Sequence, residues 1–101
     1  MAKAVGLLEV YGLATALYAA DIACKAANVT IEAIDKNKPA GGDSLPVPLL
    51  MMLKFRGSVS DVTAAIEAGK RAANEVSGYV ADKIIASPDE NMEKLLKLSC
   101  L

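Results

Sequence analysis

The residues best suited to chemistry lie in one breaker-rich segment, KNKPAGGDSLPVP, which spans residues 36–48. It carries two lysines, Lys36 and Lys38, together with the carboxylate of Asp43 and the hydroxyl of Ser44. Groups of these kinds bind charged small molecules through ion pairs and hydrogen bonds. A phosphate-binding loop is a weaker interpretation, because neither the Walker spacing nor a helix start follows Gly42. A flexible linker remains the plain alternative, since Gly-Gly loosens the backbone and proline blocks strand extension.

Catalytic chemistry finds little support elsewhere in the chain. The carboxylates Glu9, Glu32 and Asp35 are not paired with a nucleophile or base at a recognisable spacing. Histidine is absent, which removes the commonest general base and the commonest metal ligand. Cys24 and Cys100 have neither a metal-binding nor a disulfide-framework spacing, which favours a reducing, cytosolic compartment. We therefore predict no enzyme, no cofactor and no metal, with Cys24 packed as a small apolar side chain and Cys100 in the tail.

Length and composition predict one small domain, over residues 3–98, because single cores usually occupy roughly 100 to 150 residues. Side chains are 53% hydrophobic but only 4% aromatic, so the core must be thin and built from aliphatic groups. The net charge of -1 gives no basic excess for nucleic acid. The apolar stretch 4–24 is interrupted by Glu9, Gly12 and Asp21, which is unfavourable for a membrane span or a signal peptide.

Hydrophobic patterning predicts four strands and two long helices. The strands are expected over 3–12, 29–35, 47–57 and 78–86, and the helices over 13–28 and 58–76. Ser58 and Asp61 have the spacing of a capping box at the start of the second helix. A short C-terminal helix is predicted over 87–98, with Ser87 as its N-cap, Pro88 at the first helical position and Glu90 completing the box.

The order of these elements predicts the fold. Both long helices end in Ala-Ala-Asn followed by a strand, so the chain contains two strand–helix–strand units in tandem. Such a repeat predicts an α/β sandwich of the ferredoxin-like split βαβ type, with an antiparallel four-stranded sheet and two helices on one face. The first helix is apolar around most of its circumference, although a surface helix needs only about a 100° stripe. Either neighbouring copies of the chain cover it, or its alanines are tolerated in water because they favour helix.

Two stretches together resemble the bacterial microcompartment shell protein domain. They are KAVGLLEVYGLATALYAADIACKAANV and FRGSVSDVTAAIEAGKRAANEV, and the similarity covers residues 3 to about 88. The resemblance is to the single-domain hexameric type found in carboxysomes and in propanediol, ethanolamine and choline utilisation compartments. It implies a homohexamer that tiles with neighbouring hexamers and other shell proteins into a cytoplasmic shell around enzymes. A pore on the hexamer axis would pass small metabolites, with no part for nucleic acid or membrane.

In that family the loop after the second strand lines the pore, and Lys36 stands where the family's lysine would. The resemblance thus implies a pore lined by Lys36, Asn37, Lys38, Pro39, Ala40, Gly41, Gly42, Asp43 and Ser44. This loop is several residues longer and richer in proline than the family's short turn, which leaves the diameter and openness of the pore undetermined. It lacks the cysteine through which some shell proteins hold a metal cluster, so no cluster is expected.

The resemblance also implies an edge between hexamers, formed by Lys25 with Asn28 and Asn74. Asn74 replaces an arginine that often completes this contact in the family, and Arg71 lies one turn earlier. The alternative for Lys25 is an ordinary solvated lysine paired with Asp21 one turn before it.

A second function stays open at this stage. Regulatory domains of ferredoxin-like fold also oligomerise and bind metabolites in the loops between strands. The chain could therefore be an oligomeric small-molecule-sensing domain.

Overall fold

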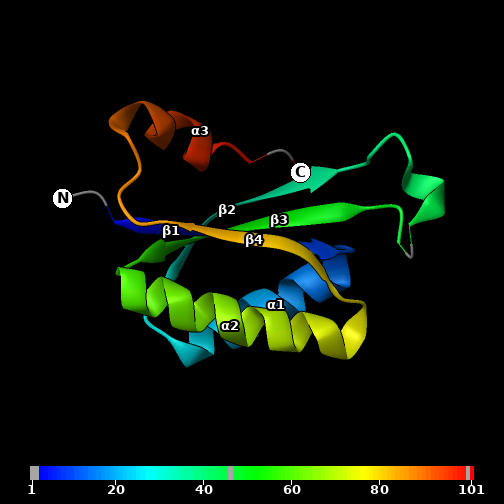
Figure 1. Cartoon of the computed structure of the whole chain (residues 1–101), viewed down its shortest axis with the longest axis horizontal. Coiled ribbons are helices and arrows are strands. Elements are labelled where there is room, and N and C mark those ends of the chain that lie inside the picture. The colour runs from blue at the N-terminus through cyan, green and yellow to red at the C-terminus, as the bar shows by residue number, and fades with distance from the viewer. Residues whose placement is uncertain (1–2, 46, 100) are drawn as a thin grey trace.

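The computed structural model describes residues 3–45, 47–99 and 101 and is shown in Figure 1. The elements are β1 (Ala4–Tyr11), α1 (Leu13–Ala26), β2 (Thr30–Asn37), η1 (Gly42–Ser44), β3 (Leu50–Gly57), α2 (Val59–Val76), β4 (Tyr79–Ile85), η2 (Glu90–Met92) and α3 (Glu93–Lys97). None of the helices in these described ranges is both long enough and apolar enough to cross a membrane.

The strands form one sheet in the order β2-β3-β1-β4, and every neighbouring pair is antiparallel. Helices α1 and α2 pack on one face of this sheet, whereas α3 lies over the opposite face (Figure 1). This is the ferredoxin-like split βαβ arrangement that the tandem strand–helix–strand pattern predicts, with the expected short C-terminal helix.

The core between the sheet and the two long helices is thin, as the shortage of aromatic residues requires. Its largest fully buried side chains come mainly from β1 and β3 and include Leu8, Leu53 and Phe55. Alanines fill most of the buried helix faces, so the layers lie close together. A Cβ on Gly69 would lie 2.9 Å from Leu8 Cδ2, and one on Gly6 would lie 2.5 Å from Val62 Cγ1. Both positions therefore require glycine for close helix–sheet packing.

The predicted start of α2 is confirmed. Ser58 is the N-cap, and its Oγ accepts a hydrogen bond of 3.1 Å from the Asp61 backbone N–H. Other boundaries differ from the prediction by one to three residues. β2 continues to Asn37, because its ladder with β3 runs on to the pair Asn37 and Leu50. Helix α1 ends at Ala26, so Asn28 lies beyond the helix.

The predicted start of the C-terminal helix is wrong. Asp89, and not Ser87, is the N-cap, with its Oδ1 accepting from the Asn91 N–H at 2.9 Å. Pro88 is buried before the first helical residue, Glu90. Aspartate caps as well as serine, and the burial of Pro88 leaves the cap to the residue that follows it.

Candidate functional site

Residues 38–45 and 47–49, which we call the β2–β3 loop, project from one end of the sheet beyond the helix layer (Figure 1). Lys36 and Asn37 pair with Met51 and Leu50 in the sheet, so the predicted site begins inside β2 and not in the loop. The side chains of Lys36, Asn37 and Lys38 are all exposed. The strand thus carries the first cations to the base of the loop, where they face solvent.

The β2–β3 loop has turn structure of its own. The Gly42 N–H donates to Pro39 O at 3.0 Å, and the Leu45 N–H donates to Gly42 O at 3.0 Å. Ser44 donates twice to Gly41 O, from its backbone N–H at 3.1 Å and from its Oγ at 2.7 Å. These bonds fold the Gly-Gly region into successive turns. A featureless linker is therefore the poorer description of this segment.

The loop closes around a shallow hollow of about 320 Å³. Gly42 is buried against the other arm of the loop, where a Cβ would lie 3.3 Å from Pro48 Cβ. The hollow is lined by Lys38, Pro39, Ala40, Gly42, Asp43 and Pro48. It therefore brings an ammonium and a carboxylate to one place, and the exposed side chains of both keep them accessible. Among the described residues, no ion pair joins Lys36, Lys38 or Asp43 to another side chain.

The β3 end of the loop is tied to the turn between β1 and α1. The Gly12 N–H donates to Leu49 O at 2.8 Å. Gly12 has φ of 87°, a left-handed conformation that favours glycine. This hydrogen bond therefore holds the end of the loop in place where the chain enters β3.

Lys25 lies in the last turn of α1, with its Nζ 2.7 Å from Asp21 Oδ2. The two side chains are 71% and 56% exposed, so the pair lies in solvent. Asp21 raises the pKa of Lys25, mainly through this hydrogen bond. Within one chain, Lys25 thus adopts the solvated arrangement, and its ammonium stays charged and open to a second molecule.

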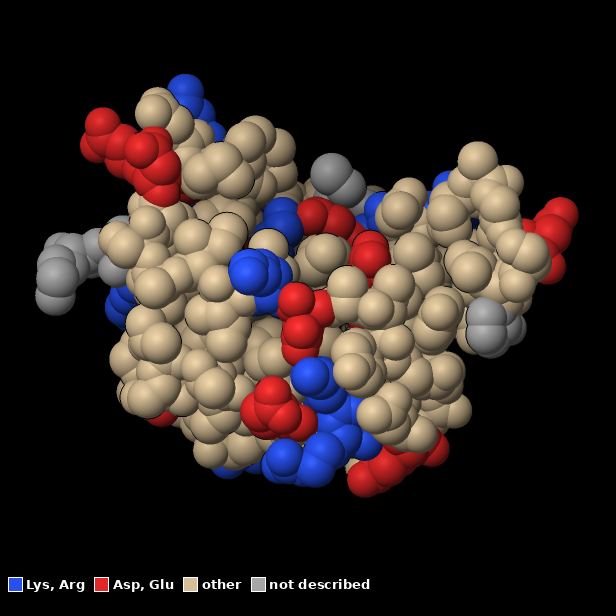
Figure 2. Space-filling model, in the orientation of Figure 1, with Lys and Arg blue, Asp and Glu red and all other residues tan. Residues whose placement is uncertain are grey.

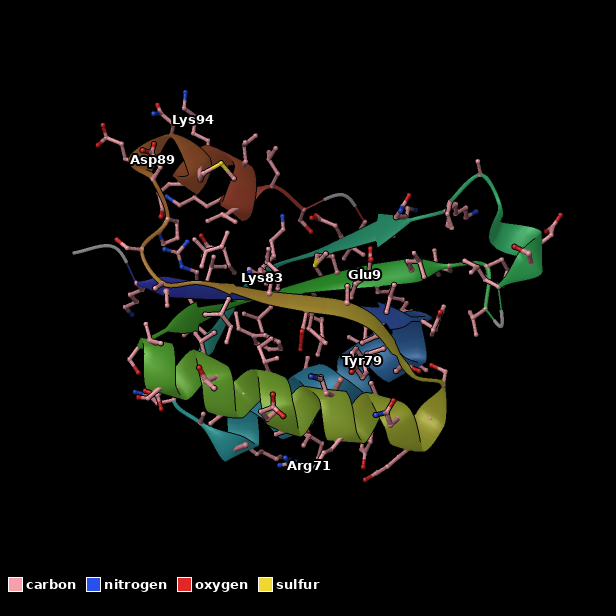
Figure 3. All side chains as sticks on the ribbon, viewed as in Figure 1. Glu9, Arg71, Tyr79, Lys83, Asp89 and Lys94 are labelled. Carbon is pink, nitrogen blue, oxygen red and sulfur yellow. The ribbon has the colours of Figure 1, made fainter. Side chains whose placement is uncertain are left out.

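Of the other predicted edge residues, Asn28 lies at the same end of the helix pair as Lys25 and Asn74 does not. The Asn28 N–H donates to Asp61 Oδ1 at 3.4 Å, at the start of α2. Asn74 is exposed in the last turn of α2, roughly 20 Å further along the helix axis at about 1.5 Å per residue. Arg71 points away from the sheet on the outer side of the helix layer (Figure 3). A single chain therefore presents Asn74 at the opposite end of the helix pair from Lys25 and Asn28.

The predicted packing role of Cys24 is wrong, because the cysteine is exposed on α1. The buried face of that helix is filled by Thr15, Ala16, Ala19, Ala20 and Ala23. Cys24 follows Ala23 by one position, which turns it about 100° away from the core. Partial burial, with a smaller effect of Asp21, raises the pKa of the thiol, so it stays protonated. The predicted position of Cys100 in a tail lies outside the described residues.

A seam of alternating charge runs between β4 and α2 (Figure 2). Lys70 Nζ lies 3.0 Å from Asp82 Oδ2 and 3.8 Å from Glu67 Oε1. It also lies 4.9 Å from the centre of the Tyr79 ring. The pKa of Lys70 is raised, first by the hydrogen bond to Asp82. These contacts join the edge strand to the helix layer, which is a structural role.

Two buried cations under the C-terminal helix were missed by the sequence analysis. Lys54 and Arg56 on β3 are only 7% and 8% exposed. Arg56 makes a forked contact with Glu93 of α3, and Lys54 pairs with Asp35 of β2. The sequence did contain a sign of this buried site. Lys54 and Arg56 are two residues apart in the otherwise apolar strand LMMLKFRG, and this spacing places both side chains on one face of the sheet.

The fold and the projecting loop define a class of small α/β sandwich that carries a polar loop at one end of its sheet. Residues 4–88 match the BMC domain, so the chain belongs to the BMC domain family. Two curated relatives that it covers almost fully are carboxysome shell protein CcmK2 of Synechocystis and bacterial microcompartment shell protein PduA of Citrobacter freundii. The first is 38% identical over 100 residues, which are 97% of this chain and 88% of the relative. The second is 35% identical over 94 residues, with coverage of 93% and 91%.

Another relative is longer than this chain. Bacterial microcompartment shell protein PduK of Salmonella typhimurium is 40% identical over 90 residues, which are 89% of this chain and 51% of the relative. The chain thus spans about half the length of the PduK proteins it matches. Among solved structures, a microcompartments protein from Desulfitobacterium hafniense superimposes with a TM-score of 0.71 at 24% identity. It covers 96% of this chain and 48% of that protein, and the likeness shows the fold.

Proposed function

We propose that this chain is a structural, non-enzymatic shell protein of a bacterial microcompartment. Its domain, residues 3–98 with the C-terminal helix included, would form homohexamers that tile with other shell proteins in the cytoplasm. Support comes from the BMC domain match over residues 4–88 and from relatives named as shell proteins of carboxysomes and other microcompartments.

The β2–β3 loop carries the proposal of a pore. It projects beyond the body of the domain and exposes the charged side chains of Lys38 and Asp43, and Lys36 exposes its ammonium at the base of the loop. Six loops around an axis would line a pore with residues 36–44, including two rings of ammonium groups and one of carboxylates. Neighbouring ammonium groups about 10 Å apart in water repel by roughly 0.4 kcal/mol, so they stay charged and still attract anions.

Exposed apolar side chains on the first helix support contact with neighbouring copies. Leu13 and Leu17 of α1 are 47% and 54% exposed, although leucine is usually buried. Val76, at the end of α2, is 55% exposed. A subunit interface would remove such surface from water, at about 25 cal/mol per Å². The edge between hexamers is assigned to Lys25, Asn28 and Asn74, with Asn74 contributed by a different copy because one chain holds it apart from Lys25.

Sedimentation and electron microscopy of the purified chain test this function. We expect a hexamer at micromolar concentration, and sheets or tubes of hexamers at higher concentration. Discrete smaller oligomers that bind a metabolite tightly would instead support a small-molecule-sensing domain of the same fold. A compact, stable monomer would contradict the shell function, because the thin core predicts low stability for an isolated subunit.

A further inference from the structure

The C-terminal segment, residues 86–99, is held on the outer face of the sheet at two separate points. The first is near the start of α3, where Arg56 Nη1 and Nη2 donate to Glu93 Oε1 and Oε2 at 3.1 and 3.0 Å. Arg56 Nη2 also donates to Lys3 O at 3.0 Å. This first point joins α3 to β3 and to the beginning of β1. Among the described residues, these Arg56 hydrogen bonds reach no residue of β2.

The second point is near the end of the segment and does involve β2. The Lys54 ammonium donates to Leu98 O at 2.9 Å and to Leu95 O at 3.4 Å, and it lies 2.6 Å from Asp35 Oδ2. An ammonium has three donors, and here two of them serve the C-terminal segment and one serves β2. A second bond supports the same junction, because Ser99 Oγ donates to Ile34 O at 2.7 Å.

Both β2 partners lie close to the base of the β2–β3 loop. Ile34 and Asp35 come shortly before Asn37, where β2 ends and the loop begins. β2 is also an edge strand, with β3 as its one neighbour in the sheet. Ser99 of the C-terminal segment adds a hydrogen bond to β2 from outside the sheet, at Ile34 O. The other end of the loop has its own attachment, from the Gly12 N–H to Leu49 O.

We propose that Lys54 is a positioning residue for the β2–β3 loop: it couples the C-terminal segment to the β2 end of the loop. The segment thereby sets the direction in which the chain leaves β2 after Asn37, between Lys36 and Lys38. The functional consequence of this coupling rests on the proposed function, in which the loop lines the pore. The contacts themselves lie within one chain, so the coupling is testable whatever the oligomeric state.

Hydrogen exchange of the full chain, followed by mass spectrometry, tests the coupling. The reporters are the hydrogen-bonded amides of Gly42, Ser44 and Leu45 in the loop. Lys54→Met removes all three donors, and Ser99→Ala removes the second bond with little disturbance of an exposed site. We expect loop exchange to rise by about tenfold in Lys54→Met, which corresponds to about 1.4 kcal/mol of local opening. Ser99→Ala should give a smaller rise in the same amides, while β1 keeps its protection.

Glu93→Ala is the matched control, because it frees the start of α3 from Arg56 without touching β2. It should speed exchange in α3 and leave the loop unchanged. Unchanged loop exchange in Lys54→Met would overturn the proposal, as would an equal rise in Glu93→Ala. If Lys54→Met does not fold, Ser99→Ala against Glu93→Ala decides by the same criterion. Sedimentation of the same samples tests the shell function separately. If the protein is not a hexamer but loop exchange still rises in Lys54→Met, the shell function is contradicted and the coupling through Lys54 is supported.

Discussion

The β2–β3 loop at the end of the sheet and the part of β3 beneath the C-terminal segment both carry charged side chains, but in opposite environments. In the loop, Lys38 and Asp43 expose their side chains to solvent. Under the C-terminal segment, Lys54 and Arg56 are almost fully buried and bind partners from other elements. An exposed charge remains available to a passing ion, whereas a buried one is committed to the chain that surrounds it. Substitutions in the two regions should therefore have different consequences.

The largest effect on stability is expected at Arg56. Arg56→Ala leaves Glu93 without its forked partner and removes the arginine stem from a buried position. Breaking a buried ion pair by removing one partner costs about 3 kcal/mol or more. Glu93 is 31% exposed, which favours the lower end. Urea unfolding at one fixed protein concentration measures this loss.

Lys94→Ala is the control for Arg56→Ala. Lys94 lies on the outer surface of α3 and points away from the sheet (Figure 3). Its loss should change the free energy of unfolding by no more than about 0.5 kcal/mol. A similarly small change in Arg56→Ala would mean that the buried pair does not hold the C-terminal segment, and the contrast between the two regions would fail.

The effect expected at Lys25 is on assembly and not on stability, because Lys25 is exposed within one chain but assigned to the contact between hexamers. Lys25→Ala should leave the hexamer and its unfolding temperature nearly unchanged, because the pair with Asp21 lies in solvent. Sheets and tubes should become rare. Weakening each edge by about 1.4 kcal/mol lowers its association constant tenfold, and a lattice needs many edges at once.

Electron microscopy measures this loss of sheets and tubes, with Arg71→Ala and Lys94→Ala compared beside Lys25→Ala. Lys94→Ala should assemble like the parent, since Lys94 lies across the sheet from the helix layer. Loss of sheets in Arg71→Ala would identify Arg71 as the cation that replaces the family's arginine. Normal sheets in Lys25→Ala would leave Lys25 as a solvated lysine. Loss of its hexamer would place Lys25 in the interface between subunits of one hexamer.

Little effect on stability is also expected where β2 passes into the loop. Lys36→Glu combined with Lys38→Glu reverses two exposed charges, so the free energy of unfolding should change by about 0.5 kcal/mol or less. Binding or permeation of small anions should fall clearly, because each ring changes sign. Lys94→Glu, a single charge reversal on α3, should leave anion binding intact. If the parent, the double variant and Lys94→Glu bind anions equally, these two lysines do not determine anion selectivity.

The sequence predicted most of the fold because the signals for it are local. Strand alternation, the Ser58 cap and the tandem strand–helix–strand units depend on residues near one another in the chain. The C-terminal helix was placed too early because Ser87 and Asp89 are both good caps, and the burial of Pro88 depends on tertiary packing. The exposure of Cys24 was missed for a related reason: one position on an alanine-rich helix decides between core and solvent.

The candidate site was less predictable than the fold. The segment and its charged residues stand out in the sequence, but the turns from Pro39 to Leu45 depend on backbone bonds that composition does not specify. The buried cations were harder still. Lys54 and Arg56 form ion pairs with Asp35 and Glu93. These partners are distant in the sequence and approach the two cations only in the folded domain.

The central claim is that six copies bring the charged loop to a common axis, and an electron cryomicroscopy structure of the assembled protein tests it most directly. We predict a sixfold ring in which residues 36–44 surround the axis, with Lys25 at the outer edge facing the next hexamer. A ring that places residues 36–44 on its outer rim, or an assembly without sixfold symmetry, would contradict the account.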